Sequence, residues 1–592
     1  MEKQKPKKFK KIVLIFSIVI CSVFGAFLLG ACLLYNSINL DVEKLTSTNN
    51  GIKVYSATGE DSTLYNSNRS IIEIDTLPDY VLNAFVDTED KNFYKHNGYD
   101  LKRILKACLV NLTTHSKSQG ASTISQQLVK NALLSNEKTY KRKIEELVLS
   151  IKMEKKFTKQ EILQMYLNTI YFGSNAYGLE NASATYFGKS AKDLTLSEAC
   201  CLAGLIKSPA KYSPKINMQN AVERRNLVAK SMYKNNHITN DDLNLVLASN
   251  IDVLMGTENE HSYEKEAIYE ACRLLNISER ELINREYQII TNKDDKLQSE
   301  VININKEIMQ NAEEKCNESL DSISVVADDN GRIVAYYCNS NYNLHNVKRQ
   351  PASTLKPFAV YYPCLKHNIL CPATHILDEE INYSGFAPKN ADNKFHGYVS
   401  TREALSQSLN VPAVKALDYV GLDKSMDALM DFGFLISNED KNLSLALGAT
   451  KNGVDLMQLL SAYSTLACSG IQHNLTFIDK ILDKDGNIVY ENENYYDCIA
   501  KAEDCFLLTD MLKETAKTGT ARRLNSLNLP VASKTGTASN GTSSTDLYNI
   551  AYTTKHTVLT WIADVNKNEI GGKLYSSVEP TEINKQILSK LQ

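Results

Sequence analysis

The chain has 592 residues, of which 43% are hydrophobic; this is enough for about two to four domains with sizeable cores and excludes a disordered or fibrous protein. The formal net charge is −3 and no long basic tract follows the N-terminal residues, which argues against nucleic acid as the main partner. The 13 cysteines include no Cys-x-x-Cys pair and no Cys/His cluster with zinc spacing, so no dedicated metal centre is predicted.

A long apolar run follows the charged N-terminus. Six lysines precede Ile12, and residues 12–35 are almost wholly apolar, which is long enough for a helix that spans a bilayer. Because lysines precede this run and acidic residues follow it, we expect a cytoplasmic tail at residues 1–11, a single transmembrane helix at 12–35, and the bulk of the chain outside the cell membrane. A cleaved signal peptide is the competing interpretation, since Leu29-Gly-Ala-Cys32 resembles a lipoprotein cleavage site; the sequence does not tell whether Cys32 is lipidated.

Residues 36–76 contain many Ser, Thr, Asn and Gly residues, which favours a stalk. Within it, Ile52-Lys-Val-Tyr55 alternates like a short strand. Residues 77–235 then show helical periodicity and are predicted to form a mainly α domain.

The clearest predicted helix covers residues 140–157. Its expected apolar stripe, which would anchor the helix, consists of Ile144, Leu147, Val148 and Ile151. Glu146 lies off this stripe, one turn from Arg142 on the same face, so a functional site can use both side chains.

An acidic segment near the start of the helical region is the first candidate site. Glu89 and Asp90 are followed by two aromatic residues, His96 and Gly98, a pattern typical of an acid held on a turn against an apolar floor. Desolvation there would raise the pKa of Glu89 toward general-base work. A solvated acidic helix start before Lys91 is the alternative for this dipeptide taken alone.

Several further motifs follow this segment in order. They are Gly120 to Asn131 (GASTISQQLVKN), Arg142 to Glu146 (RKIEE), Ile170-Tyr-Phe-Gly173, Tyr186-Phe-Gly-Lys189 and Leu194-Thr-Leu-Ser-Glu198. From about Leu77 to Pro214 the chain resembles the family 51 glycosyltransferases, the peptidoglycan polymerases that join lipid II into glycan strands. The resemblance implies a lysozyme-like helical fold for residues 77–235.

The same resemblance implies roles for individual residues. Glu89 would deprotonate the sugar hydroxyl of lipid II, and Glu146 would be the second catalytic glutamate, which orients the lipid diphosphate. No cofactor is required by the sequence, although the resemblance allows a divalent cation, Mg²⁺ or Mn²⁺, at Glu146. Cations and neutral donors suited to the anionic leaving group are Lys130, Arg142 and Lys143, with Ser122 and Gln127.

Residues 236–321 are polar and mixed and are predicted to be a linker with its own small packing. Ser322 to Tyr336 then form two predicted strands joined at Asn330-Gly331, a strong hairpin signal. A new domain is therefore predicted at residues 322–592.

Three short motifs supply the second candidate site. Ser353 and Lys356 lie three residues apart at a predicted helix start and hence on one face. Ser-x-x-Lys alone is unspecific, but Ser408-Leu-Asn410 and Lys534-Thr-Gly-Thr537 complete an ordered set. This set resembles the transpeptidase domain of a class A penicillin-binding protein, which implies an α+β fold related to serine β-lactamases, with an antiparallel sheet flanked by helices.

A second Lys-Thr-Gly-Thr occurs at Lys517 to Thr520. It follows an apolar stripe of helical spacing, so Lys517 is predicted at a helix C-terminus, where a cation is merely stabilising. Lys534 instead follows a strand-like entry. An edge strand there could bind an extended peptide, with Gly536 removing a side chain that would obstruct it.

The resemblance implies that Ser353 attacks the D-alanyl-D-alanine bond of a stem peptide and forms an acyl-enzyme. Lys356 would be the base, Ser408 would relay a proton, and Asn410 would position the substrate amide. The terminal carboxylate would bind Lys534, Thr535 and Thr537 beside Gly536. The chain departs from the family pattern at Ala352 and Ser533 (usually glycine), at Tyr337-Cys338 (often Gly-Gly) and at Tyr548-Asn549 (typically Trp-Phe).

The function expected from both resemblances is a membrane-bound, bifunctional peptidoglycan synthase that polymerises lipid II and cross-links stem peptides, and that β-lactams inhibit. Its expected partners are lipid II, glycan strands, stem peptides, β-lactams, the membrane and other cell-wall synthesis proteins, with no nucleic acid. The alternative is a glycan polymerase whose C-terminal half is a D,D-carboxypeptidase or a β-lactam-binding module. The sequence leaves the acceptor peptide, the β-lactam affinity, the role in division or elongation and the oligomeric state open.

Overall fold

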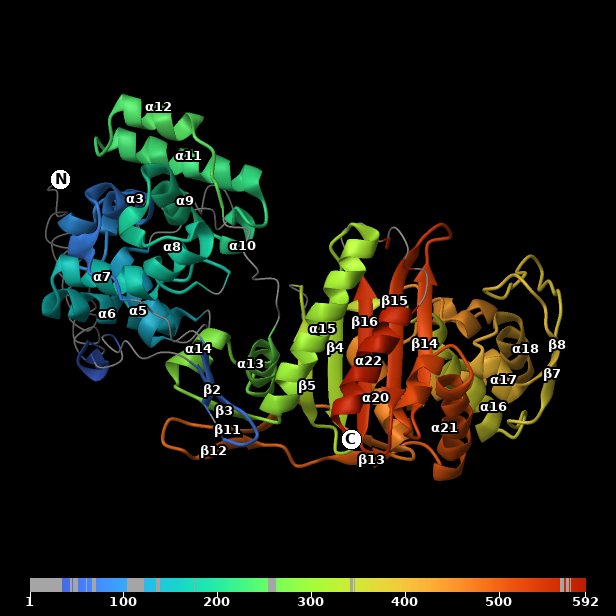
Figure 1. The fold of residues 1–592 in the computed structure, drawn as a ribbon. Coiled ribbons are helices and arrows are strands. Elements are labelled where there is room, and N and C mark those ends of the chain that lie inside the picture. The colour runs from blue at the N-terminus through green and yellow to red at the C-terminus, as the bar shows by residue number, and fades with distance from the viewer. Residues whose placement is uncertain are drawn as a thin grey trace, which may run out of the picture. The chain divides into compact units, whose positions relative to one another are not determined.

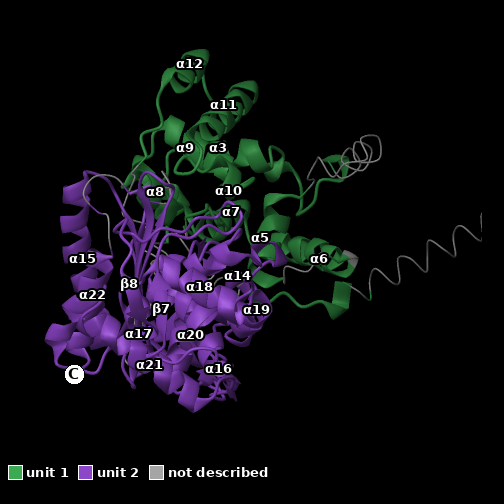
Figure 2. Ribbon diagram, turned by 90° about the vertical axis from the view of Figure 1, so that its right-hand side faces the viewer, with its two compact units in different colours: residues 1–51, 66–256 green, residues 52–65, 257–592 purple. Residues whose placement is uncertain are grey.

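The computed structural model describes residues 33, 35–42, 45, 52–59, 61–65, 71–103, 122–134, 139–174, 176–253, 262–340, 344, 347–564, 569–570, 574 and 577–592. The chain forms two compact units, unit 1 with residues 1–51 and 66–256, and unit 2 with residues 52–65 and 257–592 (Figure 2). Almost all of the predicted span 12–35, including the Leu29–Cys32 motif, lies outside the described residues. Among the residues that are described, no helix is both long and apolar enough to cross a bilayer.

Unit 1 is helical, as the periodicity of residues 77–235 predicted (Figure 1). Its helices are α3 (Asp79–Glu89), α5 (Ile124–Leu133), α6 (Tyr140–Lys156), α7 (Lys159–Thr169), α8 (Leu179–Phe187), α9 (Leu196–Leu205), α10 (Pro209–Tyr212), α11 (Met218–Lys234) and α12 (Asn240–Ala248).

Threonine caps fix the starts of five of these helices, α5, α6, α7, α9 and α12. Thr123, Thr158 and Thr195 each accept a hydrogen bond from the third residue of α5, α7 and α9, and a Gln or Glu side chain there returns the bond. Such capping boxes satisfy amides that the helix itself leaves unpaired. Below them, apolar side chains from α3 to α12 pack into one continuous core that includes Phe85 and Tyr166.

Helix α6 has the predicted bounds but buries a different face. Glu146, Leu149 and Met153 are buried, whereas Ile144 is 47% exposed. The predicted stripe was therefore wrong at Ile144, although Val148 of the same stripe is buried. The buried face follows the spacing i, i+3, i+7 from Glu146, and this carboxylate is tolerated there because Lys143 forms an ion pair with it.

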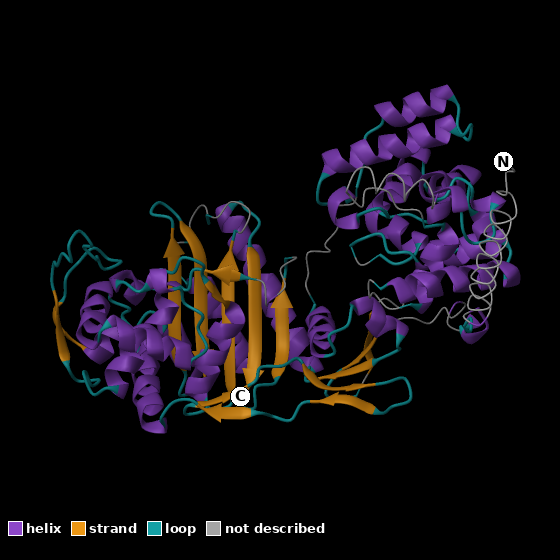
Figure 3. Cartoon of the chain, turned by 180° about the vertical axis from the view of Figure 1, so that it is seen from behind, coloured by secondary structure: helices purple, strands orange, loops and turns teal. Residues whose placement is uncertain are grey.

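The centre of unit 2 is an antiparallel sheet with the strand order β14-β15-β16-β4-β5 (Figure 3). The strands are β4 (Asp321–Asp328), β5 (Ile333–Cys338), β14 (Ala532–Ser539), β15 (Ser544–Tyr552) and β16 (His556–Ala563). The hairpin predicted at Asn330-Gly331 joins β4 to β5 and is confirmed. The fold class expected for this half, an antiparallel sheet flanked by helices, is also confirmed.

Helices cover both faces of this sheet. Asn584 of α22 (Val578–Lys590) bonds to Asn549 of β15, while Tyr552 of the same strand bonds to Thr509 of α21 (Ala502–Lys517). Since residues an odd number apart on a strand point to opposite faces, α22 and α21 lie on opposite sides. Helix α15 (Asp295–Cys316) packs beside α22, and α20 (Leu456–Ala467) packs on β15 and β16.

The remaining elements of unit 2 are short. The helices are α13 (Tyr263–Leu274), α14 (Glu279–Asn284), α16 (Tyr362–Lys366), α17 (Thr401–Ser406), α18 (Asn410–Val420) and α19 (Leu422–Asp431). The short strands pair in two-stranded sheets and are β6 (Lys348–Arg349), β7 (His375–Asp378), β8 (Gly397–Ser400), β9 (Val454–Asp455), β10 (Ile471–His473) and β13 (Tyr496–Cys498).

A second five-stranded sheet joins distant parts of the chain in the order β12-β11-β3-β1-β2. Its strands are β1 (Ile52–Tyr55), β2 (Asp61–Tyr65), β3 (Gln288–Thr291), β11 (Ile478–Leu482) and β12 (Ile488–Glu491). The strand expected at residues 52–55 is present, but it pairs in parallel with β3 of unit 2 and is not part of a free stalk. Likewise most of the range 236–321, expected to be a linker, belongs to unit 2 from residue 257 onward.

Candidate active sites

Glu89 ends α3, at the point where the chain turns out of the helix. Burial raises the pKa of the Glu89 carboxyl above its ordinary value, and a 2.8 Å hydrogen bond from Gln127 Nε2 to Glu89 Oε2 opposes part of the rise. The expected desolvation is confirmed, and the alternative of a solvated acidic helix start is not supported. A carboxylate in this state is suited to accept a proton near neutral pH.

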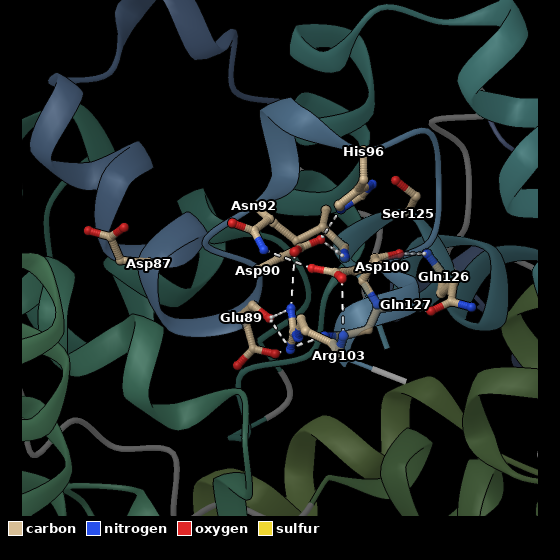
Figure 4. A network of polar contacts seen from close by, with 12 residues as sticks. Asp87, Glu89, Asp90, Asn92, His96, Asp100, Arg103, Ser125, Gln126 and Gln127 are labelled. Atoms are coloured by element: carbon tan, nitrogen blue, oxygen red, sulfur yellow. Dashed lines mark hydrogen bonds and ion pairs between the residues drawn. The ribbon is translucent and has the colours of Figure 1, made fainter. Parts of the chain in front are cut away.

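Asp90 anchors the turn that carries Glu89 (Figure 4). Its fully buried carboxylate accepts hydrogen bonds from His96 Nε2 at 2.8 Å, Arg103 Nη1 at 3.0 Å and the backbone N–H of Ile124 at 3.0 Å. Arg103 also donates to the carbonyl oxygen of Glu89 at 3.0 Å. The turn is therefore held from α5 and from the segment after α3, which fixes the backbone at Glu89.

Gln127 lies between Glu89 and a buried tyrosine. Its amide nitrogen donates to Glu89, and its amide oxygen accepts a hydrogen bond from Tyr166 Oη at 3.3 Å. Gln127 was expected among the ligands of the diphosphate. In the structure it orients the carboxylate of Glu89, because Tyr166 fixes which end of the amide faces the acid.

A second polar cluster surrounds Glu146 on α6. Lys143 Nζ donates to Ser122 Oγ at 2.9 Å and forms a short ion pair with the buried Glu146. Arg142, next to Lys143, has Nε and Nη1 buried, and among the described residues these atoms have no hydrogen-bond partner. Buried donors without a partner are costly, so they point to an acceptor that binds there.

Lys130 completes the set of cations expected in unit 1, and it lies exposed in the last turn of α5, three residues after Gln127. The sequence pattern did not single out Arg103 or Tyr166 as members of the Glu89 site. Both act on Glu89 through a backbone oxygen or another side chain, and no local spacing signals such contacts.

The serine of unit 2 lies on a tight turn. Ser353 belongs to a 3₁₀ segment, Ala352–Leu355, that is followed by the π-helical Pro357–Tyr361, so Ser353 and Lys356 lie at a helix start as predicted. Ala352, which replaces a usual glycine, has a φ of +49°. A side chain in this left-handed region is unfavourable, and the strain is held by packing around the turn.

Lys356 points from this turn to the Ser-x-Asn motif. Its Nζ donates to the carbonyl oxygens of Ser408 and Leu409, at 2.8 and 3.2 Å, and to Asn410 Oδ1 at 2.7 Å. Burial, together with the positive charge of Lys534, holds the pKa of Lys356 well below its ordinary value. A neutral amine has only two N–H groups, so deprotonation releases one of the three bonds and exposes a lone pair.

Lys534 approaches the same motif from β14. Its Nζ donates to Ser408 Oγ at 2.8 Å and to the Thr535 carbonyl at 2.9 Å. Burial lowers the pKa of Lys534 to about 7. The structure therefore brings Lys356, Ser408, Asn410 and Lys534 together, although they are spread over almost 180 positions of the sequence.

The next residues of β14 face different partners. Thr535 Oγ1 contacts Thr520 Oγ1 at 2.6 Å, and the exposed Thr537 contacts Ser577 Oγ at 3.2 Å. A Cβ on Gly536 would lie 2.6 Å from Thr354 Cγ2. The absent side chain thus lets β14 pack against the serine turn, a contact that the sequence analysis did not predict; the expected space for a bound peptide stays a prediction.

Open space adjoins this turn. A cavity of about 450 Å³ is bordered by Ala352, Gly448, Thr450 and Thr537. Its lining is mostly polar, and it provides room for an extended polar ligand between the serine turn and the end of β14.

A buried polar network lies beneath β14. Ser533 Oγ accepts a hydrogen bond from Asn549 Nδ2 at 3.0 Å, and Asn549 Oδ1 accepts one from Asn584 Nδ2 at 2.7 Å. From Asn584 the series of hydrogen bonds continues through Thr560 and Ser324 to Asn305 of α15. Ser533 and Asn549 are two of the departures from the family pattern, and the network shows that they are structurally linked.

The two sites and their folds define a protein with two catalytic units, one that transfers glycosyl groups and one that acylates a serine. A model of the transglycosylase family matches residues 57–233, and a model of the penicillin-binding protein transpeptidase domain matches residues 322–589. The chain belongs to the class A penicillin-binding proteins, which are bifunctional enzymes of peptidoglycan synthesis with glycosyltransferase and serine transpeptidase activity.

Individual relatives agree with this family. Penicillin-binding protein 1F of Bacillus subtilis is 32% identical over 91% of this chain and 77% of its own length. Penicillin-binding protein 1A/1B of the same organism is 30% identical over 100% of this chain and 67% of its own length. The crystal structure of penicillin-binding protein 1A from Haemophilus influenzae has the same fold, with a TM-score of 0.53 at 18% identity and 92% coverage of both chains.

Proposed function

We propose that unit 1 polymerises lipid II with Glu89 as the general base, and that unit 2 cross-links stem peptides through an acyl intermediate on Ser353. The observation that carries this proposal for unit 2 is the pair of buried lysines, Lys356 and Lys534, that converge on the Ser-x-Asn motif beside the serine turn. For unit 1 it is the desolvated carboxyl of Glu89 on a rigid turn.

In unit 1, Glu89 takes the proton of the acceptor sugar hydroxyl, whose oxygen attacks the anomeric carbon of the growing strand and expels the lipid diphosphate with inversion. The unpartnered Nε and Nη1 of Arg142 suit the anionic leaving group. Lys143 and Ser122, already joined by a 2.9 Å bond, present further donors, and Lys130 adds a charge nearby.

One residue of this cluster, Glu146, could bind a divalent cation. Mg²⁺ is commonly held by one or two carboxylates together with substrate phosphates, and Glu146 is one such carboxylate. Among the described residues no group of three His, Cys, Asp or Glu side chains forms a cage, so a bound Mg²⁺ or Mn²⁺ would share its ligands with the diphosphate, whose charge it would neutralise. Lys143, paired with Glu146, supplies part of this neutralisation by itself.

In unit 2, neutral Lys356 removes the proton of Ser353 as Oγ attacks the D-alanyl-D-alanine carbonyl. Asn410, whose Oδ1 accepts a hydrogen bond from Lys356, positions the substrate amide, and Ser408, hydrogen-bonded to Lys534, relays a proton to the departing D-alanine. The amino group of a second stem peptide then attacks the acyl-enzyme and releases the cross-link. Lys534, Thr535 and Thr537 bind the terminal carboxylate along β14, which Gly536 allows to lie against the serine turn.

We also propose that the protein acts at the cell membrane, anchored by residues 12–35, where lipid II and other cell-wall synthesis proteins are its partners. The lysines before this apolar run and the acidic residues after it support an extracytoplasmic position for both units. β-Lactams would acylate Ser353 because they mimic its peptide substrate.

Two variants test the proposal with one purified full-length protein and lipid II. Ser353→Ala should lose labelled-penicillin acylation and cross-linking but still polymerise, whereas Glu89→Gln should lose polymerisation and keep acylation. Release of D-alanine without cross-linked product would instead identify unit 2 as a carboxypeptidase. Polymerisation that survives Glu89→Gln would refute the role of Glu89.

A further inference from the structure

The second Lys-Thr-Gly-Thr sequence, Lys517 to Thr520, lies against the transpeptidase motifs. Helix α21 ends at Lys517, as the sequence predicted, and the following loop packs on the segment that leads into Ser408. The backbone N–H of Thr520 donates to the Ser406 carbonyl at 3.2 Å. A Cβ on Gly519 would lie 2.2 Å from that oxygen, so a glycine is required for this approach.

The last residue of this loop reaches the catalytic strand. Thr520 is exposed, but its hydroxyl lies 2.6 Å from the hydroxyl of Thr535, which is 8% exposed. Thr535 follows Lys534, which donates to Ser408 Oγ. One loop therefore contacts both the segment that carries Ser408 and the threonine proposed to bind the substrate carboxylate.

The short distance between the two hydroxyls raises the question of which one donates. Each threonine has one O–H proton and can accept further hydrogen bonds on its oxygen. If Thr535 donated to Thr520, its single proton would be unavailable to an anionic ligand. If Thr520 donates, the Thr535 proton stays free to point at a carboxylate, and its oxygen is polarised by the accepted bond.

We propose that Thr520 is a positioning residue for transpeptidation, whose hydroxyl donates to Thr535 Oγ1 and thereby directs the Thr535 proton to the carboxylate of the peptide or β-lactam. The inference rests on the proposed function, because it requires that Thr535 binds this carboxylate. It adds a residue outside the three motifs that the sequence analysis identified.

The test compares the second-order rate constants for acylation by benzylpenicillin, which has a free carboxylate, and by its methyl ester, which has none. Thr520→Val keeps the size of the side chain but removes the donor. We expect it to lower the rate constant for the acid about tenfold, as for one hydrogen bond to a charged group, and to leave that for the ester within about twofold. The loss should appear in the dissociation constant of the initial complex and not in the acylation step.

Three controls complete the experiment. Thr520→Ser restores the hydroxyl and should restore the rate. Thr518→Val, in the same loop but bonded to Glu514, should change neither rate constant. Thr535→Val should lower the rate for the acid, and adding Thr520→Val to it should cause no further loss, because both changes remove one interaction.

The outcomes separate the inference from the function on which it rests. Equal losses for acid and ester in Thr520→Val, or no loss for either, would overturn the positioning role. Unchanged acylation by the acid in Thr535→Val would overturn it as well. Wild-type protein that penicillin does not acylate, or Ser353→Ala that it still acylates, would instead refute the proposed transpeptidase site.

Discussion

Lys534 Nζ donates to Ser408 Oγ across 2.8 Å, and Lys356 Nζ donates to the backbone carbonyl oxygen of the same serine, also at 2.8 Å. Both lysines are fully buried, and burial lowers the pKa of each side-chain amine. Two ammonium groups so close together repel each other, so the site favours the state in which one lysine is neutral and the other charged.

This pairing predicts a bell-shaped dependence of penicillin acylation on pH. The rate should rise with pH as Lys356 loses its proton and becomes a base, and fall above a pH of about 7 as Lys534 loses the charge that binds the carboxylate. Lys534→Arg should remove the alkaline limb, because an arginine keeps its charge throughout this range. Labelled-penicillin kinetics between pH 5 and 9 measure both limbs, and an alkaline limb that persists in Lys534→Arg would contradict the assignment.

The polymerase site should respond to Gln127 in its own pH profile. The hydrogen bond from Gln127 lowers the pKa of Glu89, so Gln127→Leu should raise that pKa further. A base works only when deprotonated, and the acid limb of lipid II polymerisation should therefore move to higher pH. Tyr166→Phe removes only the bond that orients the Gln127 amide and should shift the limb less. A limb that stays in place in Gln127→Leu would show that Glu89 does not control it.

Gly536→Ala tests the packing of β14 on the serine turn. The added methyl group would lie 2.6 Å from Thr354 Cγ2, so the strand should move away from Ser353, and acylation should fall about tenfold or more. Thr354→Ser removes the opposing methyl group and keeps the hydroxyl that donates to Pro351. The double variant should regain much of the lost rate, and a double variant as slow as Gly536→Ala would place the conflict elsewhere.

The buried network below β14 should contribute strongly to the stability of unit 2. Asn584→Leu removes the hydrogen bonds that Asn584 makes with the buried amide oxygen of Asn549 and the buried hydroxyl of Thr560, and we expect a loss of about 2–4 kcal/mol in the free energy of unfolding. Asn311→Leu, on the exposed side of α15, should change it by less than about 0.5 kcal/mol.

The chain contains a single tryptophan, Trp561, which is buried in β16. Its fluorescence during denaturant unfolding reports on unit 2 alone and is the measurement for both variants. Equal stabilities of Asn584→Leu and Asn311→Leu would contradict the role of the network.

The sequence predicted the residues of the transpeptidase site better than their surroundings. Lys356, Ser408 and Lys534 are far apart in the chain, and only the ordered motif set could relate them. Thr520 and Ser577, by contrast, meet β14 through loops whose positions depend on tertiary packing. No local pattern indicates such contacts, and for the same reason Asp90 and Arg103 were not predicted as the support of Glu89.

Periodicity located helix α6 correctly but not its buried face. The helix could bury the face with Ile144 or the face with Glu146. The ion pair of Glu146 with Lys143 allows the acidic side chain to be buried, while the isoleucine stays exposed. A hydrophobic stripe assumes that charged groups face solvent, and this assumption fails where a charge is buried at a site.

The pairing of β1 with β3 has a practical consequence for dissecting the enzyme. Because β1 and β2 precede residues 66–256 in the chain while β3 follows them, this larger part of unit 1 is inserted between strands of unit 2. A truncated transpeptidase that starts at residue 257 would lack two strands and leave the edge of β3 open to aggregation. A soluble fragment is better made by replacing residues 66–256 with a short flexible connection, which retains the hairpin at residues 52–65.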